Sequence, residues 1–228
     1  MLQLNNIAKS YQAGQVKCQA LSGVNLQIKH GEMVALCGPS GSGKSTLLNI
    51  CGLLDLAYQG ELYFDGEHLH NNAHHCMLLR RQQLGFIFQR FNLVPVMSAY
   101  ENVEYPLLLN KMSAATRRKK VLQILDAVGM SSFTQAKPEC LSGGQQQRVA
   151  IARALVHQPR LVIADEPTAS LDSVSAHQVI ELMKSIGKAQ QTTFVIATHD
   201  SRMSLHCERQ ILLHDGQIQS GGDRQCVA

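Results

Sequence analysis

One short segment constrains this chain more than any other part of its sequence. It reads Gly38, Pro39, Ser40, Gly41, Ser42, Gly43, Lys44 and Ser45, and it fits the pattern G-x-x-x-x-G-K-S/T in full. Apolar residues 33–37 before it predict a strand, and residues 46–50 after it predict a helix. A glycine-rich turn between a strand and a helix is typical of a loop that wraps around phosphate groups. The sequence therefore predicts an α/β sheet with a phosphate-binding loop at one strand end.

Each residue type in this loop suits phosphate for a physical reason. Glycines tolerate positive φ and carry no side chain, so backbone amides can surround an anion closely. The following helix presents its positive N-terminus to the same charge. Lys44 supplies a cation for the β- and γ-phosphates of a nucleotide, and the hydroxyl of Ser45 suits Mg²⁺. With the next residue, Thr46, the loop makes up the phosphate part of the expected ATP site.

A second candidate site follows the apolar strand predicted over residues 161–164. Asp165 and Glu166 come at the carboxyl end of that strand, which is the edge where such sheets bind ligands. We predict that Asp165 holds the Mg²⁺ shell through a water and that Glu166 is the general base for the attacking water. The alternative is an acidic pair that caps a helix, but the complete phosphate loop earlier in the chain favours the catalytic role.

The remaining segments predict how the chain is organised. Strands alternate with helices in the last third, which implies a mainly parallel sheet. The first third predicts short strands and a hairpin tip at Asp65 and Gly66, so we expect an antiparallel N-terminal β subdomain. A helical insertion lies between these parts. The other strands are expected over residues 2–4, 24–28, 61–64, 192–197 and 210–213, and the helices over residues 101–109, 117–128, 145–156 and 173–188.

A third segment opens the helix predicted from residue 145 and reads Leu141, Ser142, Gly143, Gly144 and Gln145. A hydroxyl and two glycines at a helix N-terminus offer a second anion site, although an ordinary capped helix start has the same residues. Together with residues 146–155 and the two sites above, this segment resembles the signature of the ABC ATPases. The resemblance covers essentially the whole chain, with every expected motif in order.

The resemblance implies roles for further residues. Tyr11 resembles the aromatic residue that stacks on adenine in this family, and residues 170–172 resemble its D-loop. Gln89 resembles the glutamine that links Mg²⁺ and the attacking water to the helical insertion, and would be a metal ligand as well as a catalytic residue. His199 resembles the switch histidine that contacts the γ-phosphate. Taken alone, Tyr11 suits core packing and His199 suits a buried structural histidine.

Residues 85–95 and 100–107 resemble the lipoprotein-release and macrolide-export group of this family. That resemblance implies an ATP-hydrolysing subunit that drives a separate integral-membrane permease for export, lipoprotein release or mechanotransmission. It also implies a homodimer in the ATP-bound state, in which Ser142, Gly143 and Gly144 of one copy enclose the ATP held by the other. A periplasmic adaptor is a further candidate partner. Cys140 and Ala169 depart from the usual family pattern, but neither replaces a catalytic group.

We expect a single ABC ATPase domain over residues 1–228. Its ATP-binding core and β subdomain would occupy residues 1–90 and 141–228, and its helical subdomain residues 91–140. Two other functions stay open. A division-type regulator ATPase coupled to a permease-like partner has the same motifs. A soluble ABC-type ATPase acting on nucleic acid or ribosomes usually carries coiled-coil insertions, zinc modules or a second ATPase domain, which we do not find, so we expect no nucleic-acid partner.

Composition bears on where the protein works. Its seven cysteines are scattered without C-x-x-C spacing, which favours reduced thiols. The sequence predicts neither a signal peptide nor an apolar run long enough to span a bilayer. We therefore expect a cytoplasmic protein that is peripheral on the inner face of the cell membrane through its permease.

Two polar clusters leave alternatives open. The basic run over residues 117–120 favours a solvated helix face over a contact with an anionic membrane. A second cluster favours a polar surface loop over a metal site, and it contains His68, His70, His74, His75 and Cys76.

Overall fold

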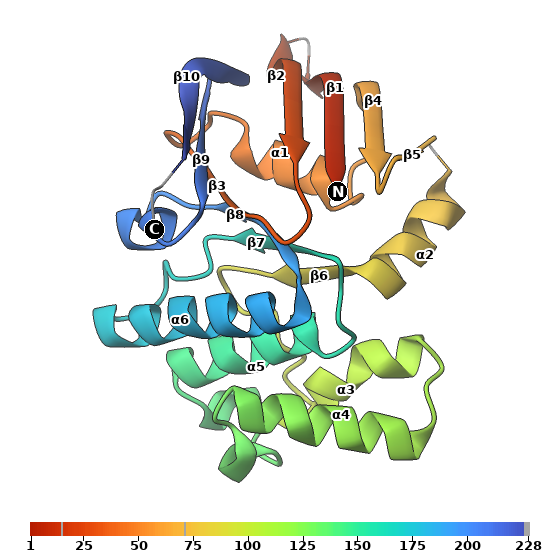
Figure 1. Cartoon of the computed structure of the whole chain (residues 1–228), viewed down its shortest axis with the longest axis vertical. Helices are drawn as coiled ribbons and strands as arrows, with labels where there is room; N and C mark the ends of the chain where they lie inside the picture. The colour runs from red at the N-terminus through yellow and green to blue at the C-terminus, as the bar shows by residue number, and fades with distance from the viewer. Residues whose placement is uncertain (15, 71, 226–228) are drawn as a thin grey trace.

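The computed structural model describes residues 1–14, 16–70 and 72–225, which form two β-sheets and the helices packed on them (Figure 1). The smaller sheet stands at the top of Figure 1 and is antiparallel, with the order β2–β1–β4–β5. Its strands are β1 (Leu2–Ala13), β2 (Val16–Ile28), β4 (Gln59–Phe64) and β5 (Glu67–His68). The hairpin tip predicted between β4 and β5 is confirmed, since Asp65 and Gly66 have φ values of 53° and 80°.

The larger sheet has the order β10–β9–β3–β8–β7–β6. Its strands pair in parallel except β10, which is antiparallel to β9. The interior strands are buried apolar runs, as expected for strands covered on both faces. The strands are β3 (Met33–Cys37), β6 (Leu84–Ile87), β7 (Leu161–Asp165), β8 (Thr193–Ala197), β9 (Arg209–His214) and β10 (Gln217–Gln225).

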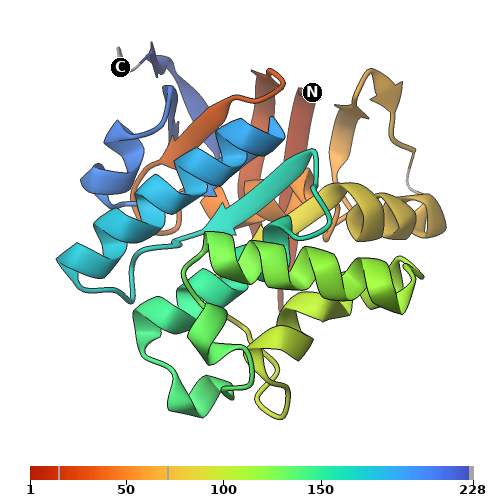
Figure 2. The same ribbon diagram turned by 60° about the horizontal axis from the view of Figure 1, so that its bottom comes forward.

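Alternating residues of this sheet face two separate cores. On one face, Leu36 and Val195 pack with α1 (Lys44–Cys51) and the smaller sheet. On the other face, Ile196 packs with the larger helices. Figure 2 brings these helices forward, with α3 to α5 in green and α6 in blue. They are α3 (Ala99–Leu109), α4 (Ala114–Ala127), α5 (Gly143–Leu155) and α6 (Ser173–Gln190). Of the two other helices, α2 (Ala73–Gln83) buries Cys76 in the first core, and α7 (Ser201–Leu205) buries Met203 in the second.

Side-chain caps decide where several helices begin. Ser98 and Glu101 form a capping box at α3, and Ser142 and Gln145 form another at α5. The expected helix starts at residues 101 and 145 are therefore two residues late, because they were placed on the third helical residue of each box. Helix α4 begins three residues before the expected residue 117, since the Ser113 hydroxyl accepts from the Thr116 amide.

The N-terminal strands are longer than the sequence predicted. Strand β1 extends to Ala13 rather than residue 4, and β2 begins at Val16 rather than residue 24. Their pairing is interrupted by register shifts between Leu4 and Ser10, and Asn6 has a φ of 52°. Such bulges break the alternation of apolar and polar residues while the ladder continues, so the pattern ends before the strand does. The α/β fold class, with an antiparallel N-terminal sheet and a mainly parallel second sheet, is confirmed.

The segment 91–140 holds α3, α4 and two short 3₁₀ turns, Ser131–Phe133 and Pro138–Cys140. Its buried side chains join the same core cluster as α5 and the larger sheet. The boundaries expected for a helical subdomain stay a prediction. The shared core indicates that this segment folds together with the sheet rather than beside it.

We predict that Leu125→Ala lowers the free energy of unfolding by about 2–5 kcal/mol, because Leu125 is fully buried in α4. We expect a single unfolding transition, since Leu125 and Ile196 of β8 belong to one cluster. Urea unfolding followed by far-UV circular dichroism measures both. The matched control, Leu122→Ala, removes an exposed leucine of the same helix and should change stability by about 0.5 kcal/mol or less. Two separate transitions would show that the helical segment unfolds by itself.

Candidate nucleotide-binding site

The register of the larger sheet brings the predicted site residues to one edge. Leu36 of β3 and Asp165 of β7 both lie opposite Ala197 of β8, so three strands end at the same level. Backbone hydrogen bonds extend this alignment beyond the strands, from the Glu166 amide to the Ala197 carbonyl at 2.9 Å and from the Thr198 amide to the Leu36 carbonyl at 3.1 Å. The phosphate loop, the acidic pair and the segment before His199 therefore leave the sheet side by side.

The glycines of the loop are required by its close contacts. Gly38 and Gly43 have φ values of 150° and 103°. A Cβ atom on Gly38 would lie 2.1 Å from the Leu213 carbonyl oxygen, and one on Gly43 would lie 2.5 Å from the Ala20 carbonyl oxygen. No side chain larger than hydrogen fits at either position without moving the backbone. The loop can therefore keep this conformation only with glycine at residues 38 and 43.

Segments that are distant in the sequence hold the phosphate loop through backbone hydrogen bonds. The Gly216 amide, in the turn between β9 and β10, donates to the Ser42 carbonyl at 3.0 Å, and the Ser22 amide of β2 donates to the Gly216 carbonyl at 2.9 Å. Ser42 is 2% exposed, and its hydroxyl has no hydrogen-bond partner among the described residues. These contacts tie the loop to both sheets.

The start of α1 is open to an anion. Gly43 is its N-cap and provides no side-chain cap, so the first helical amides are not occupied by a side-chain acceptor. Lys44 Nζ donates to the Gly38 and Pro39 carbonyls at 2.8 Å each, which holds the ammonium group over the loop. Ser40, Gly41 and Ser45 are exposed, and Thr46 is half-buried. Backbone amides and one cation thus converge, as phosphate binding requires.

The acidic pair lies next to this loop. Burial raises the pKa of the Asp165 carboxyl, and the charge of Glu166 raises it further, whereas the nearby Lys44 lowers it. The alternative that the pair caps a helix is wrong, because the N-cap of the following α6 is Asp172. Neither carboxylate is used to cap a helix, so both lie at the strand edge where such sheets bind ligands.

Glu166 and His199 are brought into direct contact. His199 Nδ1 lies 2.7 Å from Glu166 Oε1, and the His199 amide donates to Glu166 Oε2 at 3.4 Å. Glu166 has a φ of 47°, which turns its side chain away from the direction of β7. The side chain of His199 is 72% exposed, so it is not a buried structural histidine. A carboxylate hydrogen-bonded to an imidazole has the composition of a proton-transfer site.

Gln89 and the segment 170–172 meet beside the acidic pair. The Ser170 hydroxyl donates to the Gln89 carbonyl at 3.2 Å. Arg153 of α5 donates to the carbonyls of Phe91 and Asn92, both of which have positive φ. The exposed Gln89 therefore lies in a connection that is held at both ends, by the loop before α6 and by α5.

The signature segment faces a different part of the molecule. Ser142 and Gln145 bond to each other as a capping box, and Gly143 and Gly144 begin α5. A Cβ atom on Gly144 would lie 3.0 Å from the Ser175 hydroxyl of α6. The neighbours of this helix start thus lie in α6, in the loop before it at Ser170 and Leu171, and at Phe91, while the contacts of the phosphate loop run to the two sheets.

Tyr11 lies on the smaller sheet, opposite Cys18 of β2. Its ring is 42% exposed, so the alternative of core packing is wrong. The Tyr11 hydroxyl donates to Asp55 Oδ2 at 3.3 Å, and Lys9 Nζ lies 4.9 Å from the ring centroid. Lys9 also pairs with Asp55, which holds the tyrosine at the sheet surface with part of its ring available.

Sequence reasoning missed Asp200, which organises the segment after His199. Asp200 is the N-cap of α7, accepts from the Thr168 hydroxyl at 3.1 Å and forms a two-pronged ion pair with Arg202. The hydrogen bond from Arg202 is the largest cause that lowers the pKa of Asp200. An Asp before a short helix with an Arg two residues later is the signal that could have indicated it.

A glycine loop at a helix start, with two carboxylates at the end of a parallel strand two places along the same sheet, defines a nucleotide-hydrolysing domain of the phosphate-loop class. A family model described as "ABC transporter" matches residues 21–169. The chain belongs to the ABC transporter family, as an ATP-binding domain that hydrolyses ATP. Among the described residues, no helix combines the length and apolar character needed to cross a membrane.

Relatives and solved structures agree with this assignment. An uncharacterised ABC transporter ATP-binding protein of Methanocaldococcus jannaschii, MJ0796, is 44% identical over 96% of this chain and 95% of its own length. A macrolide export ATP-binding/permease protein of Bdellovibrio bacteriovorus is 42% identical over 96% of this chain but 34% of its own length. A dimeric structure of MJ0796 in a post-hydrolysis state with ADP and Pi matches with a TM-score of 0.90 and 42% identity, and covers 100% of both chains.

Substitution at Ser142 separates a simple helix cap from a second anion site. We predict that Ser142→Asp keeps stability within about 0.5 kcal/mol, because Asp also caps helices well. The added negative charge at this exposed helix start should nevertheless repel phosphate, so ATP-dependent dimerisation and hydrolysis should fall at least about tenfold. Analytical ultracentrifugation with ATP and a phosphate-release assay measure the two effects.

The control is Ser113→Asp, at the exposed N-cap of α4, which should leave both measurements unchanged. Full ATPase activity in Ser142→Asp would mean that the segment is only a helix cap.

Proposed function

We propose that this chain is the ATP-hydrolysing subunit of a transporter whose integral-membrane permease is a separate chain, acting in export, lipoprotein release or mechanotransmission. The observation that carries the proposal is the presence of two glycine-containing helix starts suited to anions, at α1 and α5, whose contacts run to different parts of the fold. The Bdellovibrio relative named as an ATP-binding/permease protein supports it, because the present chain matches only the part equivalent to 34% of that protein.

A homodimer would bring the two helix starts together. Within one copy, a Cβ atom on Gly143 or Gly144 would lie nearest to Phe91, Leu171 and Ser175 rather than to the copy's own phosphate loop. A second copy placed head to tail would set its Ser142, Gly143 and Gly144 against the nucleotide on this loop. The structures of MJ0796, which are dimeric, support a homodimer. We therefore propose that the dimer forms in the ATP-bound state and encloses two nucleotides between its copies.

Within each site, the residues of this chain have separate tasks. The loop amides and Lys44 hold the β- and γ-phosphates, and Tyr11 offers its exposed ring face to adenine. Glu166 accepts the proton of the attacking water. His199 holds that carboxylate in place and reaches the γ-phosphate from its exposed position.

The same sheet edge suits Mg²⁺. Burial and the charge of the neighbouring Glu166 raise the pKa of Asp165, and a nearby divalent cation would favour its ionised form. We propose Ser45, Gln89 and Asp165 as the residues that hold the ion, directly or through water. When bound, Mg²⁺ neutralises charge on the phosphates. Gln89 would also report the state of the nucleotide to the helical segment, because its loop is fastened to Ser170 and Arg153.

We propose that the permease binds over a pocket of about 230 Å³ beside this glutamine loop. Residues of α2, β6, α3 and α5 line the pocket, and Leu109 of α3 combines with Arg80 and Arg81 of α2 at its wall. Leu108 and Leu109 are 44% and 46% exposed, which is typical of a surface that a partner covers. This contact would place the chain on the inner face of the cell membrane, and a periplasmic adaptor would join through the permease.

We predict that Glu166→Gln binds ATP, traps the dimer and hydrolyses ATP about 10²–10⁴-fold more slowly, because the general base is lost while the phosphate contacts stay. Single-turnover hydrolysis and size-exclusion chromatography with ATP measure these effects. The control is Glu61→Gln on the exposed surface of β4, which should hydrolyse normally. Turnover near the unmodified rate in Glu166→Gln would remove Glu166 from this role.

The trapped variant also tests the transport proposal. We expect tagged Glu166→Gln, incubated with ATP and Mg²⁺ in detergent-solubilised native membranes, to co-purify with a permease that mass spectrometry identifies. Leu108→Glu with Leu109→Glu in the same background should lose the permease but still form the dimer. Recovery of cell-division proteins would favour the regulator instead. Recovery of ribosomal or DNA-bound proteins alone would contradict a membrane partner.

A further inference from the structure

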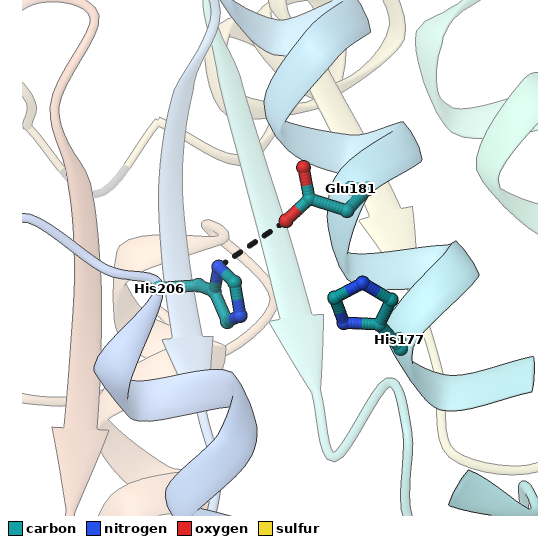
Figure 3. A group of neighbouring side chains, drawn as sticks. All are labelled: His177, Glu181 and His206. Atoms are coloured by element: carbon teal, nitrogen blue, oxygen red, sulfur yellow. Dashed lines mark ion pairs between the residues drawn. The ribbon is translucent and has the colours of Figure 1, made fainter. Parts of the chain in front are cut away.

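Three metal-binding side chains meet between α6 and α7, away from the nucleotide site. His177 and Glu181 project from α6, and His206 is the C-cap residue of α7 (Figure 3). The metal-ligating atoms of the three side chains all lie within 4.8 Å of one another. Among the described residues this is the one such group of three or more histidine, cysteine or acidic side chains. The histidine cluster noted in the sequence, around His68 and His75, is not such a group.

The placement follows from the helix period and from the packing of α7. His177 and Glu181 are four residues apart and so share one face of α6. His206 comes from a helix that follows β8, and its ring lies edge-on to that of His177 with centroids 6.0 Å apart. Glu181 and His206 also line a pocket of about 520 Å³ between α6 and the α7 turn. Solvent therefore reaches all three donors.

We propose that His177, Glu181 and His206 bind a divalent transition-metal ion of the Zn²⁺ type. Two imidazoles and a carboxylate form a donor set that zinc uses with further positions filled by water. Ca²⁺ and Mg²⁺ prefer oxygen donors, so the two imidazoles select against them.

The distances suit such an ion. Bonds of about 2.0–2.1 Å in a tetrahedron separate neighbouring donors by about 3.3 Å. Glu181 Oε1 and His206 Nδ1 are already 3.3 Å apart. His177 has only to approach this pair by a side-chain rotation, which its exposed position on α6 allows.

A simple surface ion pair between Glu181 and His206 is the competing explanation. Such a pair between exposed groups contributes little stability and gives no reason for His177 to join it. Lys184, one turn further along α6, lies 3.5 Å from His206 Nδ1. Its positive charge opposes a cation at this place, so the bound ion must displace it. The metal-site explanation therefore predicts that removing Lys184 tightens Zn²⁺ binding, whereas a simple ion pair predicts no effect of Lys184 on Zn²⁺ binding.

The experiment is a Zn²⁺ titration of the full chain, first stripped of metal, in competition with a chromophoric chelator and followed by thermal unfolding. We expect a single ion per chain and a Zn²⁺-dependent rise in Tm. His177→Ala and Glu181→Gln should each weaken binding at least about tenfold, since even outer-shell changes at metal sites cost about 10–100-fold. Lys184→Gln should tighten it. Because no nucleotide is present, the result is independent of the ATPase proposal.

Matched controls remove other candidate ligands. His214→Ala, His70→Ala and Cys140→Ser change exposed side chains elsewhere and should leave Zn²⁺ affinity unchanged. Circular dichroism without metal checks that every variant is folded. Equal Zn²⁺ affinity in His177→Ala and the unmodified chain would overturn the proposal. Loss of binding in His70→Ala or Cys140→Ser, with His177→Ala unaffected, would do so as well.

Discussion

The common level at which three parallel strands end is the constraint on which the rest of this structure depends. Leu36 and Asp165 flank Ala197 in register, and backbone hydrogen bonds continue the alignment for one more residue on either side. A shift of one residue would turn each of these side chains to the other face. Because both faces of the sheet pack against separate cores, that shift would also bury polar groups. The cores therefore fix the geometry of the phosphate and water sites.

A few contacts link the phosphate loop and the acidic pair to the helices of segment 91–140. Glu166 reaches His199 across the strand edge, and Ser170 reaches the backbone of Gln89. Arg153, half-buried in α5, fastens the residues after Gln89, and burial lowers its pKa without removing its charge. A change at the γ-phosphate position would thus be transmitted to the start of α6 and to the helices of segment 91–140. Such a coupling is what the proposed action on a separate permease would require.

Much of the fold and site could be predicted because the signals are local. The glycine pattern of the phosphate loop, the hairpin tip at Asp65 and Gly66, and the apolar runs of β7 and β8 each lie within a few neighbouring residues. The extent of β1 and β2, the strand β6 and the helix α7 were not predicted. In β1 and β2, bulges interrupt the alternation of apolar and polar residues that marks a strand. Strand β6 and helix α7 are too short to show a hydrophobic period.

The sequence by itself determined the chemistry of this protein: a loop that must be glycine, a cation beside it, two carboxylates after a buried strand, and helix starts suited to anions. Only the tertiary structure decided which of these groups meet. Glu166 and His199 are 33 residues apart, and their contact is set by strand register. His177 and His206 meet only because α7 returns against α6. Local hydrogen bonds depend on residues that are neighbours in the sequence, whereas contacts between distant side chains depend on how whole helices and strands pack.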